Sequence, residues 1–268
     1  MTPIIGIGGQ AGAGKDTVAG MMMKLQPGSA SIAQADPIKW LGLRGFGFTE
    51  EQLWGPSEKR NEVDKRYDEG RAWKEAEDVL FNGGVADQWL KMIGVGDIDS
   101  FHEWYDNLEF EFFATHRFSP RLMLQNLGTE YARTINPNVW ADSTIRIAFK
   151  LLGGGHTYNR LVGLCTNPTA PPTPMVFVTD VRFPNELIAI KSVGGKGLKV
   201  ASSSSTVSTS HASEASLGQI PDFWWDAILY NNKQEGLERL NVAVRKAYAY
   251  LKPEPAAFYV KSFVMGQE

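Results

Sequence analysis

The chain has 268 residues, of which 43% are hydrophobic and 21% charged, and its formal net charge is −3. This length and composition suit one α/β domain with a sizeable insertion, and the slight acidic balance argues against a polymeric nucleic-acid partner. Cys165 is the only cysteine, which excludes an intrachain disulfide and a thiolate metal cluster, and we interpret it as a small apolar filler.

No apolar run approaches the ~20 residues that cross a bilayer, and the chain does not begin with the basic start of a signal peptide. We therefore expect a soluble, intracellular protein with no membrane partner. Residues 45–117 hold 17 acidic against 8 basic residues, a net charge of −9, which leaves +6 on the remainder. The acidic segment either steers small polyanions or simply solvates an exposed helical surface.

A strand, a glycine-rich turn and a helix are predicted at the start of the chain. An apolar strand leads into the turn from Gly9 to Thr17, and apolar residues from Val18 to Leu25 then recur at helical spacing. Backbone N–H groups, the positive end of the helix dipole and a lysine converge there on one point. The turn therefore predicts a nucleoside triphosphate site formed by Gly12, Ala13, Gly14, Lys15, Asp16 and Thr17.

The turn departs from the spacing G-x-x-x-x-G-K-[ST] at its last place, where Asp16 precedes the hydroxyl of Thr17. Asp16 either points away from the phosphates or helps to hold Mg²⁺ through water. Thr17 is therefore the predicted hydroxyl ligand of the metal.

A short strand at 29–33 is followed by Asp36 and Lys39, at the kind of strand end where ligand-binding residues cluster. From residue 45 to 117 the pattern becomes helical, acidic and aromatic, and it opens at Thr49 with capping-box spacing. We therefore predict a helical insertion at 45–117 within a core made of 1–44 and 118–268.

Two helices and a long loop are expected next. Ser119 and Pro120 begin the first helix, which contains Gly128 and whose apolar face continues to Ile135. Gly128 allows close approach either of a ligand or of a packed helix. The second helix runs from 136 to 153 and carries Trp140. Residues 153–174 show no periodicity and form either a mobile loop or a functional one, in which Arg160 and His156 close over phosphates.

The C-terminal part returns to the α/β pattern. An apolar strand at 175–179 delivers Asp180 to its end, and a short helix from Pro184 and a strand at 197–200 follow. A flexible serine-rich loop at 202–210 and a strand at 226–230 precede the closing helix at 235–251. The inner face of that helix is predicted to carry Leu237, Leu240, Val244, Tyr248 and Leu251.

These residues offer the parts that phosphoryl transfer requires, namely positioning and positive charge. Lys15 suits the β- and γ-phosphates, and Thr17 and Asp180 suit Mg²⁺. The guanidinium groups of Arg121, Arg133 and Arg182 either clamp an acceptor phosphate or take surface and helix-pair roles.

Several motifs occur in the order seen in bacteriophage deoxynucleoside monophosphate kinases. They are the phosphate loop, 35–39, 121–130, Trp140, 179–186 and the stretch from His211 to Glu214. The chain resembles this family over 3–44 and 118–250, whereas the insertion and the 153–174 loop match less well. His211 and Glu214 are either a family pair or a loop residue and a capping acid.

The resemblance implies a three-layer P-loop kinase fold with a mainly parallel sheet, ATP and Mg²⁺ as cofactors, a possible homodimer, and the cytoplasm of an infected host cell if the chain is phage-encoded. Alternatives are another small-molecule kinase resembling dephospho-coenzyme A kinase, or a non-catalytic ATP-binding regulatory protein. A deoxynucleoside monophosphate would bind opposite ATP and be phosphorylated for phage DNA synthesis. Residues implied around this acceptor are Asp36, Lys39, Arg121, Gly128, Thr129, Arg133, Trp140, Asp180, Arg182 and Glu186.

Overall fold

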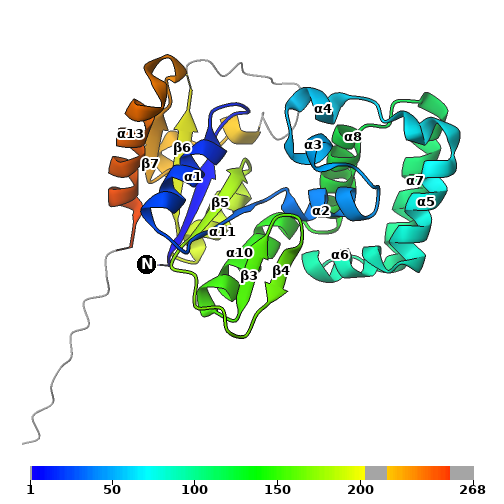
Figure 1. The fold of residues 1–268 in the computed structure, drawn as a ribbon, viewed down its shortest axis with the longest axis horizontal. Coiled ribbons are helices and arrows are strands. Elements are labelled where there is room, and N and C mark those ends of the chain that lie inside the picture. The colour runs from blue at the N-terminus through cyan, green and yellow to red at the C-terminus, as the bar shows by residue number, and fades with distance from the viewer. Residues whose placement is uncertain (1, 203–215, 254–268) are drawn as a thin grey trace, which may run out of the picture.

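The computed structural model describes residues 2–202 and 216–253. Its centre is a five-stranded sheet in the order β2-β5-β1-β6-β7, and every neighbouring pair is parallel (Figure 1). The α/β class and the predicted parallel sheet are therefore confirmed. The strands are β1 (Ile4–Gly8), β2 (Ala30–Ala33), β5 (Val176–Val181), β6 (Lys196–Ala201) and β7 (Ala227–Tyr230).

Helices cover both faces of this sheet (Figure 1). Ile5 and Ile7 of β1 belong to the buried cluster that contains residues of α1 (Lys15–Leu25) and α13 (Gly236–Leu251). Ile4 belongs instead to the cluster that contains residues of α10 (Val139–Gly153) and α11 (Pro184–Ser192). Because the central strand is buried on both faces, its sequence reads as an uninterrupted apolar run.

The insertion is helical, as predicted. Thr49 and Gln52 form the predicted capping box at the start of its first helix. After the insertion, the side chain of Ser119 caps the helix that follows it. The elements of the insertion are α3 (Glu50–Trp54), α4 (Ser57–Asn61), η1 (Lys65–Glu69), α5 (Arg71–Glu77), η2 (Asp78–Asn82), α6 (Val85–Ile93) and α7 (Ile98–Thr115). The flanking helical elements are α2 (Asp36–Arg44) before it and α8 (Pro120–Gln125), η3 (Asn126–Tyr131) and α9 (Ala132–Ile135) after it.

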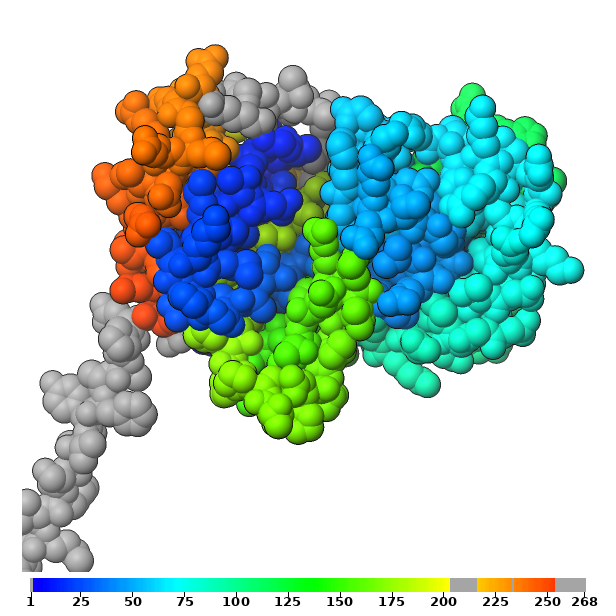
Figure 2. Space-filling view, in the orientation of Figure 1, coloured from blue at the N-terminus to red at the C-terminus, as the bar shows by residue number. Residues whose placement is uncertain are grey.

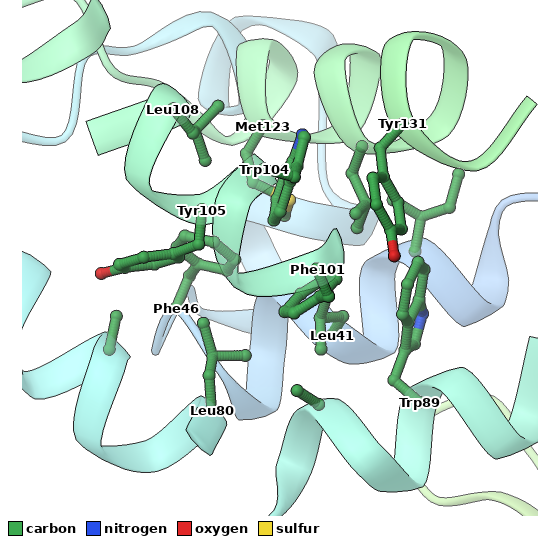
Figure 3. Packing of buried hydrophobic residues seen from close by; sticks show 14 of the residues in the cluster. Leu41, Phe46, Leu80, Trp89, Phe101, Trp104, Tyr105, Leu108, Met123 and Tyr131 are labelled. Carbon is green, nitrogen blue, oxygen red and sulfur yellow. The ribbon is translucent and has the colours of Figure 1, made fainter. Parts of the chain in front are cut away.

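An aromatic core holds the insertion together. Figure 3 shows Phe101 of α7 packed between large aromatic side chains, with ring centroids 5.5 Å from Trp89 and 5.0 Å from Trp104. The same buried cluster contains Ile38 of α2 and Met123 of α8. It therefore crosses both of the predicted boundaries of the insertion.

Two side chains predicted to face inward are exposed instead. Ile135 is 45% exposed, because the π-helical segment η3 widens the turn before it and rotates the later residues out of the apolar face. Leu237 is 67% exposed, because it lies in the first turn of α13, where the helix lines a cavity rather than the sheet.

The segment at 153–174 contains a β-hairpin and is not the structureless loop that we predicted. Strands β3 (His156–Asn159) and β4 (Gly163–Thr166) pair antiparallel, and Oδ1 of Asn159 accepts the N–H of Leu161 in the turn. The strands are four residues each and partly polar, so neither shows the apolar alternation that identifies a strand in sequence.

Within the ranges 2–202 and 216–253, no helix has the length and apolar character needed to span a membrane. The predicted serine-rich loop beyond Ser202, with His211 and Glu214, lies outside the described residues. Two short 3₁₀ turns, η4 (Asp222–Trp224) and η5 (Lys233–Glu235), flank β7.

Replacing Trp73 tests the aromatic core. Its side chain is fully buried, its indole N–H donates to the carbonyl of Tyr67 at 3.0 Å, and its ring lies 4.5 Å from that of Phe118. Trp73→Ala should lower the free energy of unfolding by about 3–5 kcal/mol in urea titrations, because it leaves a large cavity. Phe110→Ala, at a position that is 83% exposed, is the control and should change it by less than about 0.5 kcal/mol. Equal effects would contradict this packing.

Candidate active site

The glycine-rich turn is held in place from the far end of the chain. Gly14 precedes α1 with φ +94°, and a β-carbon added there would lie 2.6 Å from Nδ2 of Asn231. That same Nδ2 donates to the carbonyl of Ala13 at 2.9 Å. Glycine is therefore required at position 14 both by its backbone angle and by the close approach of the residue that follows β7.

A cavity of about 440 Å³ opens beside this turn. Lys15, Asp16 and Thr17 of α1 line one side of it, and Leu237 and Leu240 of α13 line another. The cavity thus combines a phosphate-binding turn with an apolar wall. Such a combination suits a nucleotide, whose base is apolar on its faces and whose phosphates are charged.

The ammonium group of Lys15 is held by contacts within the protein. Its side chain is only 8% exposed, and its ammonium donates to the carbonyls of Gly9 at 3.0 Å and Gln10 at 3.1 Å. Nζ also lies 3.5 Å from Oδ1 of Asp180. The ammonium is therefore fixed between the turn and the end of β5.

Asp180 occupies a bulge in β5. The register with β1 pairs Ile7 with Thr179 and Gly8 with Val181, so Asp180 is the extra residue. Its φ of +63° is unusual for a residue other than glycine. Bulges of this kind redirect a side chain, and here the carboxylate is brought to the phosphate turn.

Positive charges keep Asp180 ionised. Burial alone would raise its pKa, but Arg182, Lys15 and Lys39 together hold the pKa well below its usual range. Nη2 of Arg182 lies 3.3 Å from Oδ1. The carboxylate is therefore available as an anionic oxygen ligand at neutral pH.

The donor set at this edge fits Mg²⁺. The Thr17 hydroxyl and the Asp180 carboxylate are hard oxygen ligands, and both lie beside the phosphate turn. Among the described residues no group of three or more histidine, cysteine or acidic side chains forms a metal site. Bound Mg²⁺ would thus take its other ligands from phosphates and water, as it commonly does.

A second polar group lies on α2. Burial lowers the pKa of Lys39, while Asp180 and Asp36 oppose that shift, and Asp16 and Arg60 also act on it electrostatically. Burial raises the pKa of Asp36, although that carboxylate accepts hydrogen bonds from Ala33, Tyr158 and Trp54. Charged groups of the phosphate turn, β5 and α4 therefore act electrostatically on this lysine of α2.

Arg133 and Glu186, two of the residues that the resemblance implies around the acceptor, form an ion pair with each other. Their Nη2–Oε1 distance is 2.6 Å, and the arginine lies 3.8 Å above the Phe183 ring. Oε2 of Glu186 accepts the N–H groups of Arg182 at 2.8 Å and Phe183 at 3.1 Å. This buried pair shapes the turn that presents Arg182, because it satisfies the backbone groups at the start of α11.

Gly128 and Trp140 are also buried in packing contacts. A β-carbon on Gly128 would lie 2.8 Å from Cδ1 of Ile38, and its carbonyl accepts the indole N–H of Trp140 at 3.0 Å. The interpretation of Gly128 as a helix-packing residue is thus the one the contacts favour. Thr129 is partly exposed, and Nε of Arg121 donates to Oδ1 of Asn61, which ties α8 to α4.

Several residues near these groups were not found from the sequence: Trp54, Arg60, Tyr158 and Asn231. Asn231 follows a predicted strand, so the strand-end rule that singled out Asp180 applies to it as well. The other three residues lie in the helical insertion or in the unpredicted hairpin, where no local motif marks them.

The parallel sheet, the glycine-rich turn and the helical insertion define an α/β protein whose fold is consistent with that of P-loop kinases. No protein-family model matches the chain. The chain is 26% identical over 233 residues to a protein of Acanthamoeba polyphaga mimivirus named "Putative deoxynucleotide monophosphate kinase". The matched region covers 86% of this chain and 89% of the viral protein. This distant homology supports nucleotide kinase chemistry and, with it, the use of ATP.

Breaking the buried pair tests its role in shaping the site. Glu186→Ala leaves Arg133 without its carboxylate and should lower the free energy of unfolding by about 3–5 kcal/mol. The control is Glu75→Ala in the exposed Arg71–Glu75 pair, where a loss of no more than about 1 kcal/mol is expected. Thermal unfolding monitored by circular dichroism would measure both, and a small loss for Glu186→Ala would show that the pair is dispensable.

Proposed function

We propose that the protein transfers the γ-phosphoryl group of ATP to a deoxynucleoside monophosphate. The observation that carries this proposal is the carboxylate of Asp180, which lies 3.5 Å from Nζ of Lys15 and 3.3 Å from Nη2 of Arg182, next to the lysine that lines the cavity. Lys39 also acts on this carboxylate electrostatically. The similarity to the mimiviral protein supports a nucleotide as the acceptor. A group of cations at one position suits a reaction between two phosphate groups.

In the donor half, the turn from Gly12 to Thr17 would bind the phosphates of ATP, and the cavity would receive its nucleoside against Leu237 and Leu240. Lys15 would contact the β- and γ-phosphates, because its ammonium is already held at the turn. Mg²⁺, held by Thr17 and Asp180, would offset phosphate charge when bound.

In the acceptor half, an oxygen of the monophosphate would attack the γ-phosphorus of ATP while the bond to the β-phosphate oxygen breaks. The products are a deoxynucleoside diphosphate and ADP, with no covalent enzyme intermediate. Lys39 and Arg182 would orient the attacking phosphate and balance its charge. Arg121 and Thr129 are proposed to contact the same acceptor phosphate. Arg133 would act indirectly, because its partner Glu186 positions the backbone of Arg182.

An acceptor panel tests the proposal. Labelled ATP is incubated with dTMP, dGMP, dCMP and dAMP in turn, and with dephospho-coenzyme A as the competing acceptor. Formation of a labelled deoxynucleoside diphosphate supports the proposal. Transfer to dephospho-coenzyme A alone, or ATP binding with no acceptor-dependent ADP formation, would refute it.

Removing the phosphate-turn lysine tests the donor half. Lys15→Ala should lower turnover by roughly 10²- to 10³-fold, by analogy with the loss of one preorganised donor. The far-ultraviolet circular dichroism spectrum should not change, because the side chain lies at the ligand-binding edge. Arg245→Ala, on the exposed surface of α13, is the control. Full activity of the Lys15 variant would exclude this role for the turn.

The pH profile tests Lys39. Because its pKa is lowered, Lys39 loses its charge as pH rises through a value below that of an ordinary lysine. The kcat/KM for the acceptor should therefore fall on the alkaline side, and Lys39→Arg should move that fall to higher pH because arginine stays charged. An alkaline limb at the same pH in both proteins would assign it to another group.

A further inference from the structure

The β3–β4 hairpin is joined to α2 by a side-chain hydrogen bond. Tyr158 donates its hydroxyl proton to Oδ2 of Asp36 at 2.7 Å. Asp36 also accepts the N–H of Ala33 at 2.9 Å and the indole N–H of Trp54 at 3.4 Å. The hairpin, α2 and the insertion helix α3 therefore meet at one buried carboxylate.

Arg160, in the turn of the hairpin, lies beside the same tryptophan. Its guanidinium carbon is 5.6 Å from the centroid of the Trp54 ring, and Nζ of Lys39 is also 5.6 Å from that centroid. Arg160 is exposed, and within 2–202 and 216–253 no carboxylate forms an ion pair with it. The guanidinium of Arg160 thus lies beside the Trp54 ring and has no acidic partner among the described residues. This pair of side chains suits an anionic ligand that also carries a ring.

The hairpin reaches the place where the acceptor is proposed to bind. Figure 2 shows it in green, rising between the dark blue surface of α1 and the lighter blue surface of the insertion. Lys39 is influenced electrostatically by Asp180 of β5, Asp16 of the phosphate turn and Arg60 of α4. Because Arg160 and Lys39 both lie 5.6 Å from the centroid of the Trp54 ring, a ligand at Lys39 would have the hairpin as a neighbour.

We propose that Arg160 and Trp54 form one wall of the acceptor subsite and that Arg160 contacts the bound deoxynucleoside monophosphate. This inference rests on the proposed kinase function. The guanidinium offers several N–H donors to the oxygen atoms of the nucleotide, and the indole offers an apolar face to its sugar or base. Tyr158 is a positioning residue, because its hydroxyl anchors the hairpin to Asp36.

Steady-state kinetics of hairpin variants test this wall. Arg160→Ala should raise the KM for the acceptor roughly tenfold while the KM for ATP stays unchanged, because a charge-assisted contact with only one substrate is lost. Arg160→Lys should recover part of the acceptor affinity. Thr157→Ala, at an exposed position of the same hairpin, is the matched control, and its KM values should equal those of the wild-type protein.

A binding measurement separates a contact from a loss of folding. Titration with dGMP or dTMP in the absence of ATP should change the tryptophan fluorescence, and Trp54→Phe should remove most of that change. If Arg160→Ala keeps the normal acceptor KM, or if both substrates are affected equally, the inference is wrong. An unaltered protein that transfers nothing to any deoxynucleotide would refute the kinase proposal itself, which distinguishes the two failures.

Discussion

The site depends on the carboxylate of Asp180, which a backbone bulge in β5 directs toward the phosphate turn. Asp180 leaves the ladder at a bulge, where Lys15 of the phosphate turn and Arg182, which follows β5, form ion pairs with it. Lys39 of α2 also acts on it electrostatically. The positive charges of Lys15, Lys39 and Arg182 repel one another, and the negative charge of Asp180 offsets that repulsion. Polyphosphate oxygens can then join or replace that anion, since the cations are already in position.

Rigid supports surround this group of charges. Asn231 holds the phosphate turn from the end of β7, and the buried Arg133–Glu186 pair shapes the backbone that carries Arg182. On the other side, the aromatic core of the insertion fixes α2, whose Asp36 and Lys39 face the sheet edge. Supports of this kind keep a site preorganised, which matters most for a reaction that relies on positioning.

The sequence predicted the elements whose signals are local. The parallel strands, the glycine turn and the capped helices have periodicity or fixed spacing, and each was found close to its observed bounds. The hairpin at 156–166 was not predicted, because its strands are short and partly polar. The family motifs mark Glu186, Gly128 and Trp140 without saying whether each residue touches a ligand or supports a neighbour. Which role applies is decided by contacts such as Arg133–Glu186, between residues 53 positions apart.

The proposed donor and acceptor halves form a single site only if one ligand can span both. Isothermal titration with an adenosine joined to a deoxynucleoside through a pentaphosphate chain measures this directly. If the halves face each other, this compound should bind at least tenfold more tightly than ATP or the monophosphate alone, and it should exclude both, as expected for linked ligands. Binding no tighter than ATP, with the monophosphate still able to bind, would contradict a two-substrate site.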